Sequence, residues 1–167
     1  HLRGRGISES FSIDNCLHSL FGASKASADI IAQEYGKYFG LNVGVFRGGC
    51  LTGSNHAGVE LHGFLSYIVK CAMSSRPYTI FGYKGKQVRD QIHSSDVISA
   101  FRCFIENPKN GEVYNIGGGY SNSASILEII KKLESRGLSL NYSLSENNRS
   151  GDHICYYSNL SKLKRHF

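Results

Sequence analysis

Segments with helical periodicity alternate with short β-rich segments along this chain of 167 residues. Apolar side chains recur at three- and four-residue steps in four stretches, which predicts amphipathic helices at 21–39, 61–72, 96–106 and 125–134. β-rich runs between them predict strands at 41–46, 78–81, 113–116 and 138–144. A short basic helix is predicted at the end of the chain. This alternation is typical of α/β folds with parallel strands.

Capping and breaking residues mark the ends of several predicted helices. Pro77 ends the second helix, because proline cannot continue an α-helix. Ser94 or Ser95 is expected to cap the third helix. Ser125 and Glu128 have the spacing of a capping box at the start of the fourth helix. These local signals support the predicted order of helices.

Glycine is abundant and proline is scarce, with 19 and 2 residues respectively. The glycines lie mostly where predicted strands end, in the turns 48–53 and 117–119. In open α/β sheets such ends face ligands, and glycine lets the backbone approach a ligand closely. The two turns therefore mark a candidate ligand-binding edge, while ordinary turn chemistry explains any single glycine.

Composition excludes several classes of protein. Hydrophobic residues make up 41% and charged residues 19%, which is ordinary for a globular domain and unlike a disordered chain. No apolar run approaches the roughly 18 residues of a membrane span, so no membrane partner is expected. The net charge of +6 is dispersed, without basic residues interleaved with aromatic ones. We therefore expect an anionic small molecule, not a nucleic acid, as the partner.

Cysteine and histidine spacing gives no metal site. The five cysteines are widely spaced and include no C-x-x-C pair, which favours a reducing, cytoplasmic compartment. Asp90, His93 and Asp96 have a spacing that could hold a metal, but a structural role is favoured. Asp96 suits the dipole of the helix that it starts, and His93 is expected to bond nearby backbone groups. His56 and His62 are expected to be structural as well.

Five motifs follow one another in an order that carries a resemblance. They are F-G-A-S-K at 21–25, F-R-G-G-C-L-T-G at 46–53, G-K-Q-V-R-D-Q-I-H-S-S-D-V at 85–97, Y-N-I-G-G-G at 114–119 and R-S-G-D at 149–152. Together they resemble the extended short-chain dehydrogenase/reductase family, in its nucleotide-sugar branch of NAD-dependent epimerases and dehydratases. The resemblance implies the C-terminal part of a Rossmann-type parallel sheet plus a smaller α/β substrate domain.

The resemblance also implies the ligands and the residues on the cofactor side. The cofactor is NAD, and the substrate is a nucleoside-diphosphate sugar, CDP- or UDP-linked. Lys25 corresponds to the lysine that holds the nicotinamide ribose. Cys50 and Leu51 fall at the strand end beside the nicotinamide and the sugar.

On the substrate side, Glu60 and Leu61 match positions that contact the diphosphate or the sugar. Phe81 corresponds to a contact with the base. Arg89 with Arg149 corresponds to the pair that holds the diphosphate, for which the planar guanidinium is suited. Asp152 is expected to orient Arg149 or to meet a ribose hydroxyl.

One departure from the family concerns the reaction itself. Phe21 stands where the family has its catalytic tyrosine, four residues before Lys25. A phenyl ring carries no exchangeable proton, so proton abstraction from a sugar hydroxyl cannot run through it. Either another group substitutes, with Cys50, Glu60 and His62 as candidates, or the protein binds without turnover.

A second departure concerns extent. The G-x-x-G-x-x-G turn and the catalytic Ser/Thr of the family are absent and are expected to precede residue 1. We therefore expect residues 1–53 to be the end of the NAD-binding domain and residues 54–167 the sugar-nucleotide domain, with interleaved elements. The expected parent enzyme is an epimerase, with a dehydratase or a non-catalytic binding protein as alternatives. The resemblance implies a homodimer that pairs through the helix carrying Lys25 and the following helix.

Overall fold

The computed structural model describes residues 6–13, 17–60, 62–148 and 151–167. Its α-helices are α1 (Leu20–Phe39), α2 (Phe64–Met73), α3 (Ser94–Glu106), α4 (Ile126–Glu134) and α5 (Ser161–His166). Its strands are β1 (Gly44–Gly48), β2 (Cys50–Thr52), β3 (Tyr78–Phe81), β4 (Val88–His93), β5 (Glu112–Ile116), β6 (Ser123–Ser125), β7 (Tyr142–Ser145) and β8 (Cys155–Tyr156). A single 3-10 turn, η1 (Tyr83–Gly85), lies between β3 and β4. The predicted α/β class is confirmed.

The strands form three small sheets, and the pairing is mostly parallel. β1 pairs with β5 and β3 pairs with β7, both in parallel. In the third sheet β4 is central, with β2 and β8 parallel to it and β6 antiparallel. The predicted parallel arrangement therefore holds for the described pairs except β4–β6.

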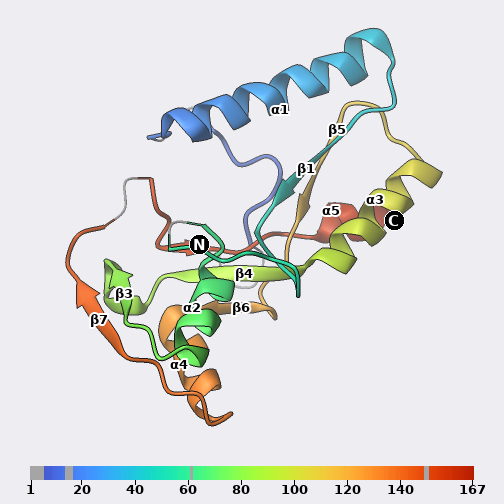
Figure 1. Cartoon of the computed structure of the whole chain (residues 1–167). Helices are drawn as coiled ribbons and strands as arrows, with labels where there is room; N and C mark the ends of the chain where they lie inside the picture. Colours follow the sequence, from blue (N-terminus) through green and yellow to red (C-terminus); the bar gives the residue numbers. More distant parts are fainter. Residues whose placement is uncertain (1–5, 14–16, 61, 149–150) are drawn as a thin grey trace.

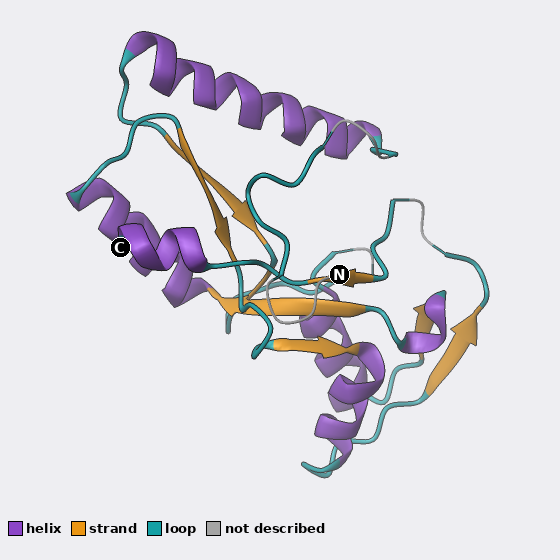
Figure 2. Ribbon diagram, turned by 180° about the vertical axis from the view of Figure 1, so that it is seen from behind, coloured by secondary structure: helices purple, strands orange, loops and turns teal. Residues whose placement is uncertain are grey.

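β4 crosses the middle of the molecule and separates two regions (Figure 1). On one side lie α2 and α4, with the β3–β7 pair beyond them; on the other side β1 and β5 rise toward α1 (Figure 1). The view from behind shows the same arrangement (Figure 2). Because β1 pairs with β5, the region next to α1 contains chain from both sides of residue 53. The proposed division at that residue stays a prediction.

The larger core lies between α2, α4 and β3. Ile68 and Cys71 of α2 are fully buried there against Ile80 of β3 and the apolar face of α4. The predicted capping box holds α4 in place: the Ser125 hydroxyl accepts a hydrogen bond from the Glu128 amide, and the Glu128 carboxylate accepts one from the Ser125 amide. Local sequence and packing therefore agree at this helix.

The predicted strands did not include the central strand β4 or several short strands. β2, β6 and β8 are only two or three residues long and were not predicted. Such segments are too short to show an alternating pattern, and each exists because it pairs with β4. The last long strand begins at Tyr142 instead of residue 138, because Leu138 and Leu140 pack into the core after α4.

The cap of α3 also differs from the prediction. α3 begins at Ser94, and its N-cap is His93, not Ser94 or Ser95. The Nδ1 atom of His93 accepts a hydrogen bond from the Ser95 amide at 3.2 Å. The expected structural role of His93 is therefore confirmed, and Asp96 lies in the first turn as expected.

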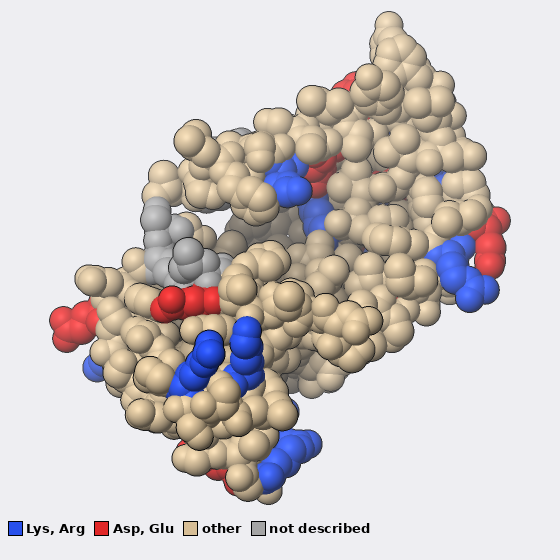
Figure 3. Space-filling model, viewed as in Figure 1, with Lys and Arg blue, Asp and Glu red and all other residues tan. Residues whose placement is uncertain are grey.

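α1 stands away from most of the described chain. Its buried residue is Gly36, where an added Cβ would lie 2.3 Å from the amide nitrogen of Gly111. In the space-filling view a recess separates α1 from the lower part of the molecule (Figure 3). Among the described residues, no helix is both long and apolar enough to cross a bilayer.

Candidate functional site

A pocket lies between the ends of β3 and β4 and the start of α2. It is lined by Phe64, Tyr78, Phe81, Gln87, Arg89, Ile126 and Asp152. The structure therefore brings together three of the predicted substrate residues: Phe81, Arg89 and Asp152. Aromatic rings form its walls and a guanidinium lies at its edge, so it can take a planar, apolar group attached to an anion.

Arg89 is held in this pocket by carbonyl and carboxylate oxygens. Its guanidinium donates to the carboxylate of Asp152, to the carbonyl oxygen of His153 and to that of Val88. The Arg89 side chain is only 13% exposed. Burial and the charge of Arg89 lower the pKa of His153, which favours the neutral form of this imidazole. Asp152 thus orients Arg89, whereas the sequence predicted that it would orient Arg149 or meet a ribose.

A second pocket adjoins the first, and Phe64 lines both. Its cavity volume is about 410 Å³, and its walls are Gly49, Cys50, Leu51, Thr52, His56, His62, Gly63, Phe64, Leu65 and Gln91. Cys50 and Leu51 come from β2, which pairs with Gln91 and Ile92 of β4. Burial raises the pKa of the Cys50 thiol from 9.0 to about 11. Cys50 is therefore a neutral thiol at pH 7, not a base.

Alternate residues of one segment supply polar groups to both pockets. Gln87 and Arg89 line the first pocket and Gln91 lines the second. Side chains two residues apart in a strand share one face, so the pattern Q-V-R-D-Q carries this information. The side-chain oxygens of Gln87 and Gln91 are buried without a hydrogen-bond partner in the described residues. Neither glutamine was predicted as a site residue, although this alternation could have identified both.

Asp90 points away from both pockets and organises the glycine-rich turns. It is fully buried, and its Oδ2 accepts hydrogen bonds from the amides of Gly119 at 3.0 Å and Ser158 at 2.9 Å. An added Cβ at Gly49 or Gly117 would lie 2.5 or 2.3 Å from its carboxylate oxygens. These two glycines are therefore required by close packing on Asp90. Within the described residues, no three His, Cys, Asp or Glu side chains form a metal cluster.

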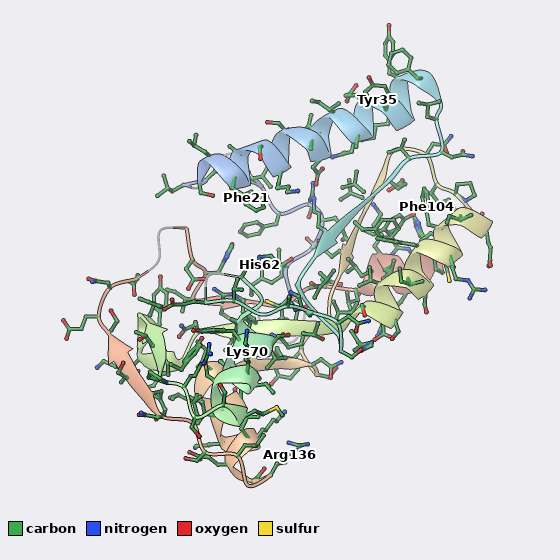
Figure 4. The ribbon with its side chains drawn as sticks, in the orientation of Figure 1. Phe21, Tyr35, His62, Lys70, Phe104 and Arg136 are labelled. Atoms are coloured by element: carbon green, nitrogen blue, oxygen red, sulfur yellow. The ribbon has the colours of Figure 1, made fainter. Side chains whose placement is uncertain are left out.

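Phe21 and Lys25 lie together on one face of α1. The ammonium nitrogen of Lys25 is 5.4 Å from the centre of the Phe21 ring, as expected for residues four positions apart. Figure 4 shows Phe21 at the N-terminal end of α1 and His62 in the loop before α2. Phe21 is 70% exposed, and neither residue lines either pocket. The structure thus does not bring them into the pocket that contains Cys50.

Of the remaining predicted site residues, the structure describes only Glu60. Glu60 is exposed and lines neither pocket. Leu61 and Arg149 lie outside the described residues. Of the three groups predicted to replace the missing tyrosine, His62 and Cys50 share the second pocket, and Glu60 does not.

Comparisons with known proteins agree with this architecture. A family model described as "NAD dependent epimerase/dehydratase family" matches residues 7–117. CDP-paratose 2-epimerase from Salmonella typhi is 37% identical over 136 residues, which are 77% of this chain and 39% of that protein. dTDP-glucose 4,6-dehydratase from Salmonella typhimurium is 32% identical over 100 residues, which are 60% of this chain and 27% of that protein.

Solved structures show the same likeness. A UDP-glucuronic acid 4-epimerase variant from Bacillus cereus, in complex with a UDP sugar and NAD, has a TM-score of 0.75 at 29% identity, covering 96% of this chain and 50% of that one. The dTDP-glucose 4,6-dehydratase of Bacillus anthracis in complex with NAD has a TM-score of 0.74 at 27% identity, covering 98% and 51%. The Rossmann-type fold predicted from the motifs is thereby confirmed.

The chain spans about two fifths of the length of the curated epimerase and about half of the solved chains. The relatives include both epimerases and dehydratases, so the likeness fixes the family and not the individual reaction. By its description the family depends on NAD, which confirms the predicted cofactor at the level of the family. The family model covers well over half of the chain, and the chain belongs to the NAD-dependent epimerase/dehydratase family.

Proposed function

We propose that this chain is the sugar-nucleotide-binding part of an NAD-dependent epimerase that acts on a CDP- or UDP-linked sugar. One observation carries the proposal: the aromatic pocket containing Arg89 continues, past Phe64, into the pocket containing Cys50 and His62. A nucleoside-diphosphate sugar has the same order of groups, with a planar base, a charged diphosphate and a polar sugar. The 37% identity to a CDP-paratose 2-epimerase favours epimerisation.

The described residues suit each part of such a substrate. Phe81 and Phe64 offer apolar surface to the base, and the unpartnered oxygen of Gln87 can accept a hydrogen bond from an amino group on it. Arg89 suits the diphosphate through its positive charge and the N–H donors that Asp152, His153 and Val88 leave free, since hydrogen bonds from a guanidinium to phosphate are charge-assisted. Asp152 keeps that guanidinium in one orientation. In the proposal Arg149 joins Arg89 on the diphosphate, and Glu60 and Leu61 approach the sugar.

Lys25 fits a role toward NAD. It lies on the exposed face of α1, and among the described residues no carboxylate forms an ion pair with it. Its ammonium group is therefore available to donate hydrogen bonds to ribose hydroxyls, with Cys50 and Leu51 beside the nicotinamide. When bound, NAD would supply hydride acceptance and donation for oxidation and reduction at a sugar carbon. The chain would form part of a two-domain enzyme, and α1 is the helix proposed to pair two copies.

Phe21 favours a second candidate, a protein that binds a nucleotide sugar without turning it over. The Phe21 ring has no hydroxyl to transfer a proton. A dehydratase would need a proton-transfer group just as an epimerase does. The epimerase, the dehydratase and the non-catalytic protein therefore differ in measurable ways. All three predict binding of a nucleoside-diphosphate sugar in the pocket of Arg89.

The test uses the full-length protein and its Phe21→Tyr variant. Each is incubated with NAD and a panel of CDP-, UDP- and dTDP-sugars, and products are followed by proton NMR. Inversion at one sugar carbon in the unmodified protein supports the epimerase, and loss of water from the sugar identifies a dehydratase. Turnover that appears only with Phe21→Tyr supports the non-catalytic protein. Absence of binding by calorimetry to every sugar nucleotide contradicts the proposal.

A further inference from the structure

Oxidation of an alcohol carbon requires a group that takes a proton. When the C–H hydrogen leaves as a hydride, the O–H bond must also break to form the carbonyl. The proton then needs an acceptor near the sugar hydroxyl, and the same group must return it when the carbonyl is reduced. Phe21 cannot accept this proton, and it does not line the pocket. The acceptor must therefore come from another residue.

The second pocket contains few groups that exchange protons. Among its described lining residues these are Cys50, His56 and His62. Cys50 keeps its proton at neutral pH, because burial raises its pKa to about 11. Glu60 is exposed and lies outside the pocket. Imidazole groups, by contrast, exchange protons readily between about pH 5 and 8. The two histidines are thus the remaining candidates.

These histidines are held relative to each other by several contacts. Nδ1 of His56 lies 3.2 Å from the hydroxyl oxygen of Ser66 on α2. The two imidazole rings meet edge to face, with centres 5.9 Å apart. The backbone of His62 forms two hydrogen bonds with Val59, at 2.9 and 3.0 Å. Gly63 has a φ of +72°, and an added Cβ there would lie 2.5 Å from the His56 ring.

This packing leaves a clear division of roles. His56 is half-buried and already bonded through one ring nitrogen, whereas His62 is exposed and lines the pocket. A glycine at position 63 allows the His56 ring to lie against the backbone directly after His62. Ser66 therefore fixes His56, and His56 restricts the ring of His62. Such restraint is what a proton-transfer group needs in order to meet a hydroxyl at a fixed position.

We propose that His62 is the acid–base residue that replaces the family tyrosine, and that His56 is its positioning residue. The inference rests on the proposed function. A ring nitrogen of neutral His62 accepts the proton of the sugar hydroxyl while the hydride passes from the same carbon to NAD, giving a ketone and an imidazolium. The imidazolium returns the proton to the oxygen when the hydride comes back on the other face. Atoms and electrons balance, with NAD as the oxidant and then the reductant.

Few other ionisable groups surround the pair. Cys50 of β2 lines the same pocket, and Lys70 of α2 lines a neighbouring pocket together with His56. Glu60 precedes His62 by two residues in the same loop. Arg89 and Asp152 act on Cys50 from the first pocket with opposite signs. An acid limb of the pH profile assigned to His62 must therefore be separated from a contribution of Glu60 by substitution.

The experiment compares the full-length protein with its His62→Gln, His56→Gln and Glu60→Gln variants, using the sugar nucleotide that turns over in the panel. Glutamine keeps a hydrogen-bonding side chain and cannot exchange a proton. We expect kcat of His62→Gln to fall about 100-fold or more, the size usual for loss of a general base, with little change in KM. The fall of kcat at acid pH, seen as the acid limb of its pH profile, should be absent in His62→Gln. Glu60→Gln should keep that limb.

Two further measurements do not depend on turnover by the unmodified site. The imidazole proton signals of His62 should shift on addition of the sugar nucleotide, and binding measured by calorimetry should stay within about threefold in His62→Gln. His56→Gln should lower kcat less than His62→Gln does. It should keep the acid limb of the pH profile of kcat, with the midpoint of that limb at a different pH.

The outcomes separate this inference from the proposed function. If the unmodified protein turns over and His62→Gln changes kcat less than twofold with the same pH profile, the role of His62 is refuted and the proposed function stands. If no variant, including Phe21→Tyr, converts or binds any sugar nucleotide, the proposed function itself fails. Signals of His62 that stay unchanged on saturation with the sugar nucleotide also refute the inference.

Discussion

One ion pair connects α1 to β1, and its partial burial gives a quantitative prediction. Arg47 of β1 donates to Asp29 of α1 through Nε at 2.7 Å and Nη2 at 3.1 Å, and through Nη1 to the carbonyl of Glu9 at 2.9 Å. Apart from Gly36, the described residues of α1 are not fully buried. Removing this pair should therefore weaken the docking of the helix.

The magnitude follows from the exposure of the two side chains. The Arg47 side chain is 25% exposed and the Asp29 side chain is 13% exposed, so this ion pair is intermediate between a surface pair and a buried pair. Surface pairs contribute about 0–1 kcal/mol, and breaking a buried pair costs about 3–5 kcal/mol. We expect a coupling energy of about 1–2 kcal/mol, after allowance for solvent screening. A double-mutant cycle with Asp29→Asn and Arg47→Met measures it by urea denaturation.

The pH dependence of this coupling has a defined sign. Despite burial, which opposes ionisation, the hydrogen bonds and charge of Arg47 hold the pKa of Asp29 below its ordinary 3.8. A carboxyl group whose pKa is lowered by folding contributes its full stabilisation at pH values above its pKa in the unfolded chain. That contribution is lost as the pH falls through its pKa in the folded protein. The coupling should therefore be constant above about pH 5 and decline below pH 3.8.

A second ion pair serves as the matched control. Lys162 and Glu112 lie 2.5 Å apart, but the Glu112 side chain is 42% exposed. Their coupling should stay below about 1 kcal/mol, as for other surface pairs. The reasoning about burial would be refuted by a coupling energy of less than about 0.5 kcal/mol between Asp29 and Arg47. It would also be refuted if the coupling energy of the control pair exceeded that of Asp29 and Arg47.

Three other substitutions or treatments test the core and the site. Ile80→Ala should lower the free energy of unfolding by about 2–5 kcal/mol, since Ile80 is fully buried; a change below 1 kcal/mol in urea denaturation would contradict the packing described. Arg89→Lys should weaken nucleotide-sugar binding by about tenfold or more in calorimetry, because lysine lacks the planar fork, and unchanged affinity would remove Arg89 from the site. Alkylation of Cys50 by iodoacetamide should be slow at pH 7 and accelerate toward pH 11. Mass spectrometry of the peptide that contains Cys50 measures the rate, and fast alkylation at neutral pH would contradict the raised pKa.

Much of the secondary structure could be predicted because its signals are local. The α4 helix begins at the predicted Ser125 capping box, and β3 has the predicted bounds Tyr78–Phe81. The first helix was predicted within one residue of α1. A helix face, a cap and a proline stop are each encoded within a few neighbouring residues. These signals depend on the backbone geometry of a single segment, and they do not require contact with another segment of the chain.

Motif order likewise gave the family and three residues of the first pocket. Phe81, Arg89 and Asp152 were expected to bind one substrate, and the structure places them in one pocket. That convergence could be expected only through the resemblance, since Arg89 and Asp152 are 63 residues apart and no local pattern links them. The roles given to Lys25 and Phe21 stay predictions.

Tertiary structure alone decided the rest. β2, β6 and β8 exist because β4 offers hydrogen-bonding partners to segments that are too short to predict. Asp90 had been weighed as a metal ligand, yet its burial makes it the acceptor for two distant amides and explains why Gly49 and Gly117 have no side chain. His56 and His62 share a pocket with Cys50 through the same long-range pairing. A sequence determines what each segment can form; which segments meet depends on contacts between residues far apart in the chain.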